Sequence, residues 1–418
     1  MNVNKYRRLQ ATTIVLLVWC GVSLLHLFPE FRFLMLGLTI LLTIQSVRML
    51  IVKPKISVPV DDGYLPTVSI VVSAKNESAV LPGLVNNIDQ LNYPFKLLDI
   101  WVIDDGSTDE TYNILSKLQT QFTWLKIHQR KSQGGKSGAL NSVLPLTKGE
   151  IFLICDADAK LPESFLKQTL PKLQNQKIAA VQVRKSIYNA GTNFLTRCQQ
   201  MEMSCDSFLQ THRIAIGGMS ELRGNGMLVK REFLEKCHGW NENTITDDLD
   251  MCFKLYLVGG EIAFLTIPSV QEEGVTTWKQ LWLQRRRWAE GGYQRYLDYF
   301  PQIFTLGWLK EIDLLLFLLL QFILPIGLIP DLLWTIFYSQ NPVLFPLQTL
   351  LSVILTIAFI CGLYQFQGLR GLSLIWATLQ GSIYMIHWIP IMIVTTLKMC
   401  VQKDPSVWVR TEHRGINH

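Results

Sequence analysis

The chain has 418 residues, a net charge of +6, and a composition that is 49% hydrophobic and 17% charged. Soluble domains usually carry more charge, and the apolar residues concentrate at residues 11–52 and 312–398. The positive charge is small and scattered, so it does not indicate a nucleic-acid partner and fits a solvated surface or attraction to anionic lipid headgroups. The composition therefore predicts membrane segments on both sides of a soluble middle domain.

The first apolar region predicts a transmembrane hairpin at residues 1–55. Residues 11–28 are uncharged and long enough to cross a bilayer, and a second run extends over 33–47 after Pro29 and Glu30. A cleaved signal peptide is the alternative for the first run, but no A-x-A cleavage site follows it. Basic residues flank the hairpin, at Lys5, Arg7, Arg8, Lys53 and Lys55. Both ends are therefore predicted to be cytoplasmic.

The second apolar region, residues 311–400, predicts C-terminal transmembrane helices followed by a polar tail at 401–418. Its apolar runs cover about 312–337, 342–364 and 371–398. Pro325 and Pro330 are expected to kink or split the first run. Three spans would place the tail outside, whereas its basic residues argue for the inside. Either one run is re-entrant or interfacial, or the first run makes two spans.

The middle domain, residues 56–275, alternates strand-like and helix-like runs. The strand-like runs are 68–75, 99–104, 125–129, 150–156 and 179–185. Helices are expected around 79–91, after an N-cap at Thr108 or Asp109, and at 136–146. This order predicts an α/β fold with a doubly wound, mostly parallel sheet, in which ligands bind beyond the carboxyl ends of the strands. The eight cysteines form no C-x-x-C pair and fit free thiols in a reducing cytosolic domain.

Acidic clusters follow two of these strands. Asp104 and Asp105 end the second strand, and Asp156 and Asp158 flank one small residue after the fourth. Two carboxylates at this spacing point to the same side and suit a hard divalent ion such as Mg²⁺. A lone D-x-D pattern is weak evidence, but its position after a buried apolar strand favours a metal site. Four carboxylates at neighbouring strand ends also require a cation or hydrogen-bond donors.

A third acidic cluster, Thr246-Asp247-Asp248-Leu249-Asp250, precedes apolar residues at helical spacing. Thr246 can cap the helix, and acidic residues favour its positive N-terminal end. Capping explains one or two of the acids but not three. The pattern therefore predicts that one carboxylate acts as a general base.

Two further motifs have both a functional and a structural interpretation. Gly134-Gly135-Lys136-Ser137 is not a Walker motif, because the required first glycine is Arg130. Its glycine turn can present N–H groups to a diphosphate, or form a plain loop. Gln284-Arg285-Arg286-Arg287-Trp288, within a predicted interfacial region at 276–310, suits diphosphate and sugar binding or contact with anionic lipids.

Taken in order, VSIVVSAKNE, DDGS, GGKSGALN, DAD, GNG, TDDLD and QRRRW resemble the motifs of the inverting family-2 glycosyltransferases of GT-A fold. The resemblance covers about residues 66–300 and includes flanking membrane helices like those of cellulose and hyaluronan synthases. It implies a GT-A-like doubly wound, mostly parallel sheet flanked by transmembrane helices.

The resemblance also implies roles for individual residues. Asp248 matches the catalytic base of the family's T-E-D motif, with Asp247 replacing the glutamate. Asp158 is expected to bind the metal directly, and Asp156 to serve both the nucleotide and the metal. The other donor-binding residues implied are Asp104, Asp105, Lys136, Gln284, Arg287 and Trp288, of which the last three match the Q-x-x-R-W motif.

A narrower set of segments resembles the cyanobacterial β-monoglucosyldiacylglycerol synthases: GGKSGALNSVLPLTKGEI, ELRGNG, TITDDLD, VQEEGVTT and QRRRWAEGGYQRYLDY. This likeness implies transfer of glucose from UDP-glucose to diacylglycerol, with Mg²⁺ or Mn²⁺ as cofactor. It also implies an integral membrane protein of the thylakoid or plasma membrane with a cytosolic catalytic domain.

Two other functions remain open from the sequence. A processive polysaccharide synthase shares the Q-x-x-R-W motif, so this motif does not discriminate. A membrane scaffold or transporter that kept a sugar-nucleotide fold would be non-catalytic.

Overall fold

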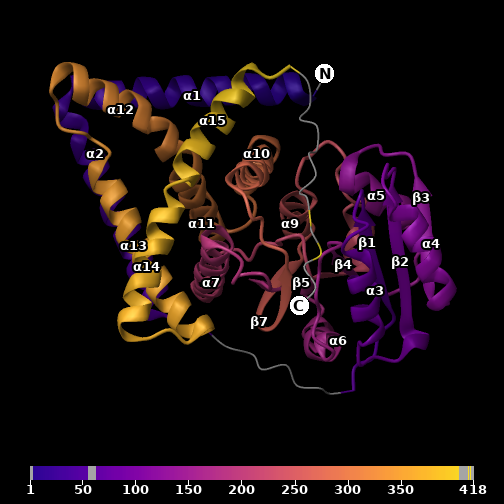
Figure 1. Cartoon of the computed structure of the whole chain (residues 1–418). Helices are drawn as coiled ribbons and strands as arrows, with labels where there is room; N and C mark the ends of the chain where they lie inside the picture. The colour runs from indigo at the N-terminus through magenta and orange to yellow at the C-terminus, as the bar shows by residue number, and fades with distance from the viewer. Residues whose placement is uncertain (1–2, 55–62, 404–412, 414, 416–418) are drawn as a thin grey trace. The chain divides into compact units, whose positions relative to one another are not determined.

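The computed structural model describes residues 3–54, 63–403, 413 and 415, and it divides into two compact units (Figure 1). The helical unit comprises residues 1–55, 204–219 and 284–407. The sheet unit comprises residues 56–203, 220–283 and 408–418. Because helices α7 (Phe194–Ala215) and α10 (Trp278–Ile303) each begin in the sheet unit and continue in the helical unit, two helices run between the units.

The sheet has seven strands in the order β3-β2-β1-β4-β6-β5-β7. Their bounds are β1 (Val68–Ala74), β2 (Leu98–Asp105), β3 (Leu125–Arg130), β4 (Ile151–Cys155), β5 (Ile178–Ile187), β6 (Met227–Lys230) and β7 (Glu261–Glu272). All neighbouring pairs are parallel except those of β6, which runs antiparallel to β4 and β5. The predicted mostly parallel α/β sheet is therefore confirmed.

Strands β6 and β7 were not among the predicted strands. β6 has only four residues, and β7 contains Pro268. A short run and an internal proline both weaken the pattern by which a strand is recognised in a sequence. Pairing with neighbouring strands, which is a tertiary effect, makes both segments part of the sheet.

Helices cover the sheet in the alternating order that the sequence predicts. The helices of the sheet unit are α3 (Leu81–Asp89), α4 (Thr111–Gln121), α5 (Gly135–Val143), α6 (Phe165–Thr169), α8 (Arg231–Lys236) and α9 (Asp247–Leu257), with short 3-10 turns η2 (Phe95–Leu97) and η3 (Leu170–Gln174). Apolar residues of α3, α4 and α6 form one buried cluster with alternate residues of the central strands, such as Val68, Ile70 and Val72 of β1. This burial attaches the helices to one face of the sheet. The loops described below follow the ends of the strands.

Five segments of the helical unit are long and apolar enough to cross a membrane: Val3–Leu27, Pro29–Ile51, Trp308–Tyr338, Phe345–Gln367 and Gly371–Val401. They contain α1 (Val3–Leu27), η1 (Pro29–Phe31), α2 (Arg32–Ile51), α11 (Trp308–Leu318), η4 (Leu319–Ile323), α12 (Leu324–Tyr338), α13 (Phe345–Gln367), α14 (Gly371–Met385) and α15 (Trp388–Val401). The π-helical turn η4 interrupts the third segment just before Pro325, where a break was expected.

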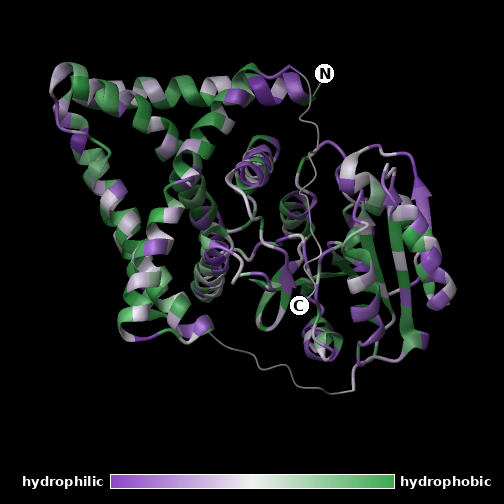
Figure 2. Ribbon diagram, viewed as in Figure 1, coloured by the Kyte–Doolittle hydropathy of each residue, from purple (hydrophilic) through white to green (hydrophobic). Residues whose placement is uncertain are grey.

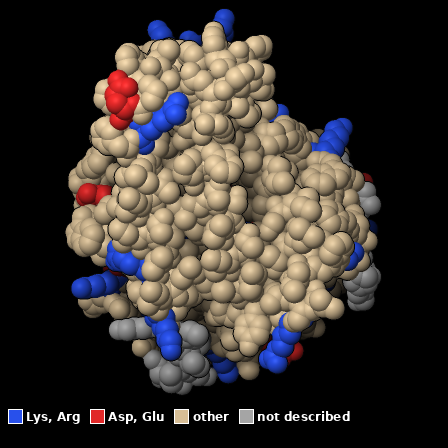
Figure 3. Space-filling model, turned by 90° about the vertical axis from the view of Figure 1, so that its left-hand side faces the viewer, with Lys and Arg blue, Asp and Glu red and all other residues tan. Residues whose placement is uncertain are grey.

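Hydrophobic residues predominate along these helices (Figure 2). On α2 the exposed side chains recur every three or four residues and are each at least 46% exposed: Phe33, Leu36, Ile40, Ile44, Val47 and Ile51. Figure 3 shows a face of the molecule that is uncharged over most of its area, and the charged groups seen on it are mainly Lys and Arg. An outward apolar stripe of this length is a property of helices in contact with lipid.

Buried polar pairs hold the helical unit together. The guanidinium of Arg213 on α7 donates to both carboxylate oxygens of Asp313 on α11, at 3.0 and 2.8 Å. Asp313 also accepts the main-chain N–H of Met219, at 3.0 Å. In the same unit, His26 of α1 contacts Asp331 of α12 at 2.8 Å. Because each pair joins helices distant in sequence, these contacts fix helix packing where apolar contacts are not directional.

Asp313→Ala is expected to lower the free energy of unfolding by about 3–5 kcal/mol, because it leaves the Arg213 guanidinium buried without its carboxylate. The matched control is Glu235→Ala, which removes the exposed partner of Arg231 on α8 and is expected to cost about 0–1 kcal/mol. Thermal unfolding of the detergent-solubilised protein measures both. Equal melting temperatures for the two variants would contradict the structural role assigned to Asp313.

Candidate active site

The three acidic clusters predicted from the sequence all lie in the sheet unit. Because β2, β1 and β4 are adjacent and parallel, the loops after their carboxyl ends meet at one edge of the sheet. Asp105 ends β2 and Asp156 follows β4, with the loop after β1 between them. Helix α9 carries the third cluster, and Lys136 contacts both Asp247 of this cluster and Asp156 of the second. The sheet therefore brings together carboxylates that are far apart in the sequence.

The first cluster is stabilised by local donors. Asp104 accepts the main-chain N–H of Ser107 at 3.0 Å, across a turn made possible by the positive φ of Gly106. Asp105 is buried and accepts the Ser132 hydroxyl at 2.9 Å, with the Arg130 guanidinium at 3.2 Å. These contacts hold the side chain of Asp105 in a fixed orientation at the end of β2.

Lys136 links the second and third clusters. Its ammonium, on α5, lies 2.6 Å from Asp156 and 3.7 Å from Asp247. Burial by itself would lower the pKa of Lys136, but Asp156 and Asp247 outweigh it and hold that pKa well above its usual range. The same attraction outweighs burial at Asp156 and lowers the pKa of its carboxyl group. Lys136 is thus a permanent cation between two acidic motifs, a contact that sequence spacing did not reveal.

The three acids of α9 have different environments. The helix begins at Asp247, after Thr246 in an extended conformation whose side chain makes no capping hydrogen bond. Asp250 accepts the Asn241 amide at 3.1 Å, whereas Asp248 accepts the N–H of Leu249 at 2.8 Å. Burial raises the pKa of Asp248, against the opposing charge of Lys136. A carboxyl group with a raised pKa is a stronger base once ionised, which suits proton abstraction.

Asp158 lies in an excess of negative charge. Its Oδ2 accepts the main-chain N–H of Glu273 at 2.7 Å. Burial, together with the nearby carboxylates of Asp156 and Glu272, raises the pKa of Asp158 to about 6 against the opposing charge of His413. A divalent cation would relieve this repulsion, and Mg²⁺ commonly takes one or two protein carboxylates with water and phosphate oxygens. The donor set at Asp156 and Asp158 therefore fits such an ion, although no group of three or more His, Cys, Asp or Glu ligands occurs among the described residues.

His413, near the C-terminus, was not predicted to belong to this site. Its Nδ1 lies 2.9 Å from Glu77, which follows β1, and its Nε2 lies 3.7 Å from Asp158. The main-chain N–H of Gly415 donates to Glu273 at 3.2 Å. Burial would lower the pKa of His413, but Asp158 and Glu77 raise it to about 10. No local pattern signals a contact between residues 336 positions apart.

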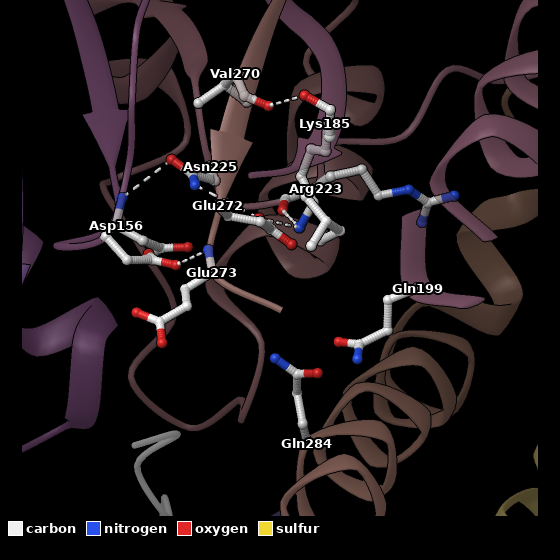
Figure 4. Close-up of polar contacts among 12 residues, drawn as sticks. Asp156, Lys185, Gln199, Arg223, Asn225, Val270, Glu272, Glu273 and Gln284 are labelled. Atoms are coloured by element: carbon white, nitrogen blue, oxygen red, sulfur yellow. Dashed lines mark hydrogen bonds and ion pairs between the residues drawn. The ribbon is translucent and has the colours of Figure 1, made fainter. Parts of the chain in front are cut away.

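The GNG motif, Gly224-Asn225-Gly226, lies against residues of the second and third acidic clusters. The buried side chain of Asn225 accepts the main-chain N–H of Asp156 at 3.2 Å and lies beside Glu272 (Figure 4). Gly224 has a positive φ, and a Cβ there would lie 3.2 Å from Asp248. In the sequence, this motif contributes to the family resemblance, but no local pattern assigns it these contacts.

The Q-x-x-R-W residues Gln284, Arg287 and Trp288 lie on α10 and belong to the helical unit. Arg285, 1% exposed, stacks on the Trp288 ring at 4.0 Å and donates to Gln284 at 2.8 Å. Arg285, which occupies the first variable position inside the motif, thus orders both of its ends. The donor-binding roles of Gln284, Arg287 and Trp288 remain predictions.

Comparisons with known proteins agree on one family. The model of the family described as "Glycosyltransferase like family 2" matches residues 66–291. The β-monoglucosyldiacylglycerol synthase of Nostoc sp. is 44% identical over 98% of this chain and 90% of its own length. The enzyme of the same name from Synechocystis sp. is 41% identical over 97% and 88%. The mannosyltransferase PcManGT of Pyrobaculum calidifontis, solved with GDP-Man and Mn²⁺, covers 92% of this chain and 99% of its own with a TM-score of 0.61 and 20% identity, which supports the fold.

The raised pKa of His413 predicts how its attachment depends on pH. Because the pKa rises from 6.5 to about 10, the stability that His413 contributes is complete below pH 6.5 and is lost progressively as the pH approaches 10. The difference in free energy of unfolding between the wild type and His413→Ala, measured in chelator-containing buffer, should follow this course. A difference that grows with pH would contradict the ion pairs of His413.

Proposed function

Because this chain belongs to glycosyltransferase family 2, we propose that it transfers glucose from UDP-glucose to 1,2-diacylglycerol with inversion, forming β-monoglucosyldiacylglycerol. The observation that carries this proposal is the 44% identity to the Nostoc β-monoglucosyldiacylglycerol synthase over 98% of the chain. A match of this extent includes the helical unit as well as the sheet unit, and so both the donor-binding and the membrane-facing parts.

UDP-glucose is proposed to bind along the edge formed by the ends of β2, β1 and β4. Asp104 and Asp105 are assigned to the uridine, and Lys136 to the diphosphate. Asp105 is already oriented by Ser132 and Arg130, so little ordering is needed when the nucleoside binds. Lys136 also lies 3.7 Å from Asp247, so the third acidic cluster adjoins the proposed diphosphate position.

Asp156 and Asp158 are proposed to hold a divalent ion, Mg²⁺ or Mn²⁺. The support comes from the burial and the neighbouring carboxylates that raise the pKa of Asp158, and from the oxygen ligands that both residues offer. When bound, such an ion offsets negative charge on the departing UDP. Gln284, Arg287 and Trp288 are assigned to the same diphosphate and to the acceptor, since arginine binds phosphate oxygens in a bidentate way and tryptophan offers a flat face to a sugar.

Asp248 is proposed as the general base. Its carboxylate accepts the proton of the glycerol hydroxyl while that oxygen forms a bond to the anomeric carbon. The bond between the anomeric carbon and the diphosphate oxygen breaks on the opposite side, and UDP leaves with the electron pair. A single displacement of this kind inverts the anomeric configuration.

The helical unit is proposed to bring the acceptor to the enzyme. Diacylglycerol is confined to the bilayer, and the five candidate spans with their outward apolar side chains suit an integral membrane protein. Restricting both protein and acceptor to the bilayer lowers the entropic cost of their encounter. The free cysteines and the basic residues around the N-terminal hairpin support a cytosolic location for the sheet unit. By resemblance to the cyanobacterial enzymes, the membrane is proposed to be the thylakoid or plasma membrane.

The decisive experiment is product analysis of the purified protein in diacylglycerol-containing vesicles with radiolabelled UDP-glucose. A chloroform-soluble monoglucosyl lipid with a β linkage, formed only with Mg²⁺ or Mn²⁺ and abolished by a chelator, is the expected product. An insoluble polymer would instead identify a polysaccharide synthase. Absence of both transfer and hydrolysis would indicate a non-catalytic protein.

Asp248→Asn is expected to bind UDP-glucose normally but to transfer glucose about 10²- to 10⁴-fold more slowly, because the amide cannot accept the proton. Calorimetric UDP binding and the rate of lipid glucosylation measure the two effects. The matched control is Asp250→Asn on the same helix, which is expected to retain transfer. Normal turnover by Asp248→Asn, or loss of turnover in the control variant alone, would exclude Asp248 as the base.

A further inference from the structure

Lys185 and Glu272 form an ion pair in the sheet unit that takes no part in the proposed mechanism. Lys185 lies on β5 and Glu272 ends β7, with Nζ and Oε2 2.8 Å apart and side chains 9% and 11% exposed. Removing both charges from water is costly, and an apolar pair of similar volume is often as stable. The pair is therefore better explained by a role other than stability, and its contacts with neighbouring residues indicate that role.

Both partners of the pair contact the loop 223–226, which contains the GNG motif. Lys185 Nζ donates to the Arg223 carbonyl at 3.4 Å, and Glu272 accepts from the Asn225 amide at 3.5 Å. The buried Gln182 completes the attachment, since it accepts the N–H of Arg223 at 2.7 Å and donates to the Asn225 carbonyl at 3.0 Å. Figure 4 shows Asn225 between Asp156 and Glu272, with Lys185 and Arg223 beyond Glu272.

The loop in turn touches two residues of the proposed chemistry. Asn225 accepts the main-chain N–H of Asp156, which sets the course of the chain immediately after β4. Gly224 lies so close to Asp248 that a Cβ there would be 3.2 Å from its carboxylate. A shift of this loop would therefore move Asp156 and the proposed base, Asp248, relative to each other.

The charge of Lys185 also reaches both carboxylates. At Asp156 and at Asp248, burial raises the pKa and Lys136 is the largest opposing influence, while Lys185 acts in the same direction as Lys136 at both. The Lys185 ammonium is thus close enough to act on the charge of both Asp156 and Asp248.

We infer that Lys185 and Glu272 are positioning residues that hold the loop 223–226 and thereby set the separation between Asp156 and Asp248. They act through the loop and touch neither substrate. This inference rests on the proposed function in one respect, the assignment of Asp248 as the base.

The test compares Lys185→Met, Glu272→Gln and the double variant in the full-length protein. Each single change leaves one buried charge unpaired and is expected to lower the melting temperature, whereas the double variant regains most of it. In all three variants, kcat for transfer is expected to fall about 10- to 100-fold, as it does for other residues that orient a site without contacting the substrate. The KM for UDP-glucose and calorimetric UDP binding should change little.

The matched control is Lys126→Met. It breaks an ion pair of similar length, Lys126–Asp99 at 2.6 Å, in which the lysine is 47% exposed. This pair lies at the start of β2 and β3, the opposite end from the acidic clusters. This control is expected to keep the wild-type kcat.

Two outcomes would overturn the inference. If the double variant regains transfer together with its stability, the pair is only structural. If KM rises while kcat is unchanged, Lys185 contacts the donor directly. A wild-type protein that glycosylates another acceptor would refute the proposed function, while the ratio of variant to wild-type turnover would still test the pair.

Discussion

The attraction between Lys136 and the carboxylates of Asp156 and Asp247 is the interaction on which the proposed active site depends. Parallel strands that end side by side collect acidic groups at one edge, and these groups repel one another in a poorly hydrated site. The Lys136 ammonium lies 2.6 Å from Asp156 and 3.7 Å from Asp247, so one partly buried cation offsets charge from both motifs. The helix α5 that carries it follows directly from the Gly134-Gly135 turn, where both residues have positive φ.

Lys136 does not balance all of the charge. Asp158 keeps a raised pKa because Asp156 and Glu272 are close and because it is buried. The remaining negative charge is a property that a catalytic cation site needs and that a purely structural site would avoid. His413 lies beside this charge, 3.7 Å from Asp158, so this residue belongs to the sheet unit although it follows the last candidate membrane span in the sequence.

Much of the fold and of the candidate site follows from local sequence. The strands β1, β2 and β4 are mostly apolar because both faces of a parallel sheet are buried, and each is followed by a polar loop. The outward stripe of α2 likewise follows from composition. Strand β6, antiparallel and only four residues long, escaped prediction because its hydrogen-bond partners, β4 and β5, and not its own pattern, make it a strand.

By itself, the sequence determined the residue types and their order: carboxylates directly after strands, a lysine after a glycine turn, and apolar helices at both ends. These are local properties, and the family resemblance depends on them. The tertiary structure alone decided which charges meet. Lys136 reaches Asp247, Lys185 reaches Glu272, and His413 reaches Glu77 across 336 residues. Such contacts depend on how strands and loops pack together, so no local spacing encodes them.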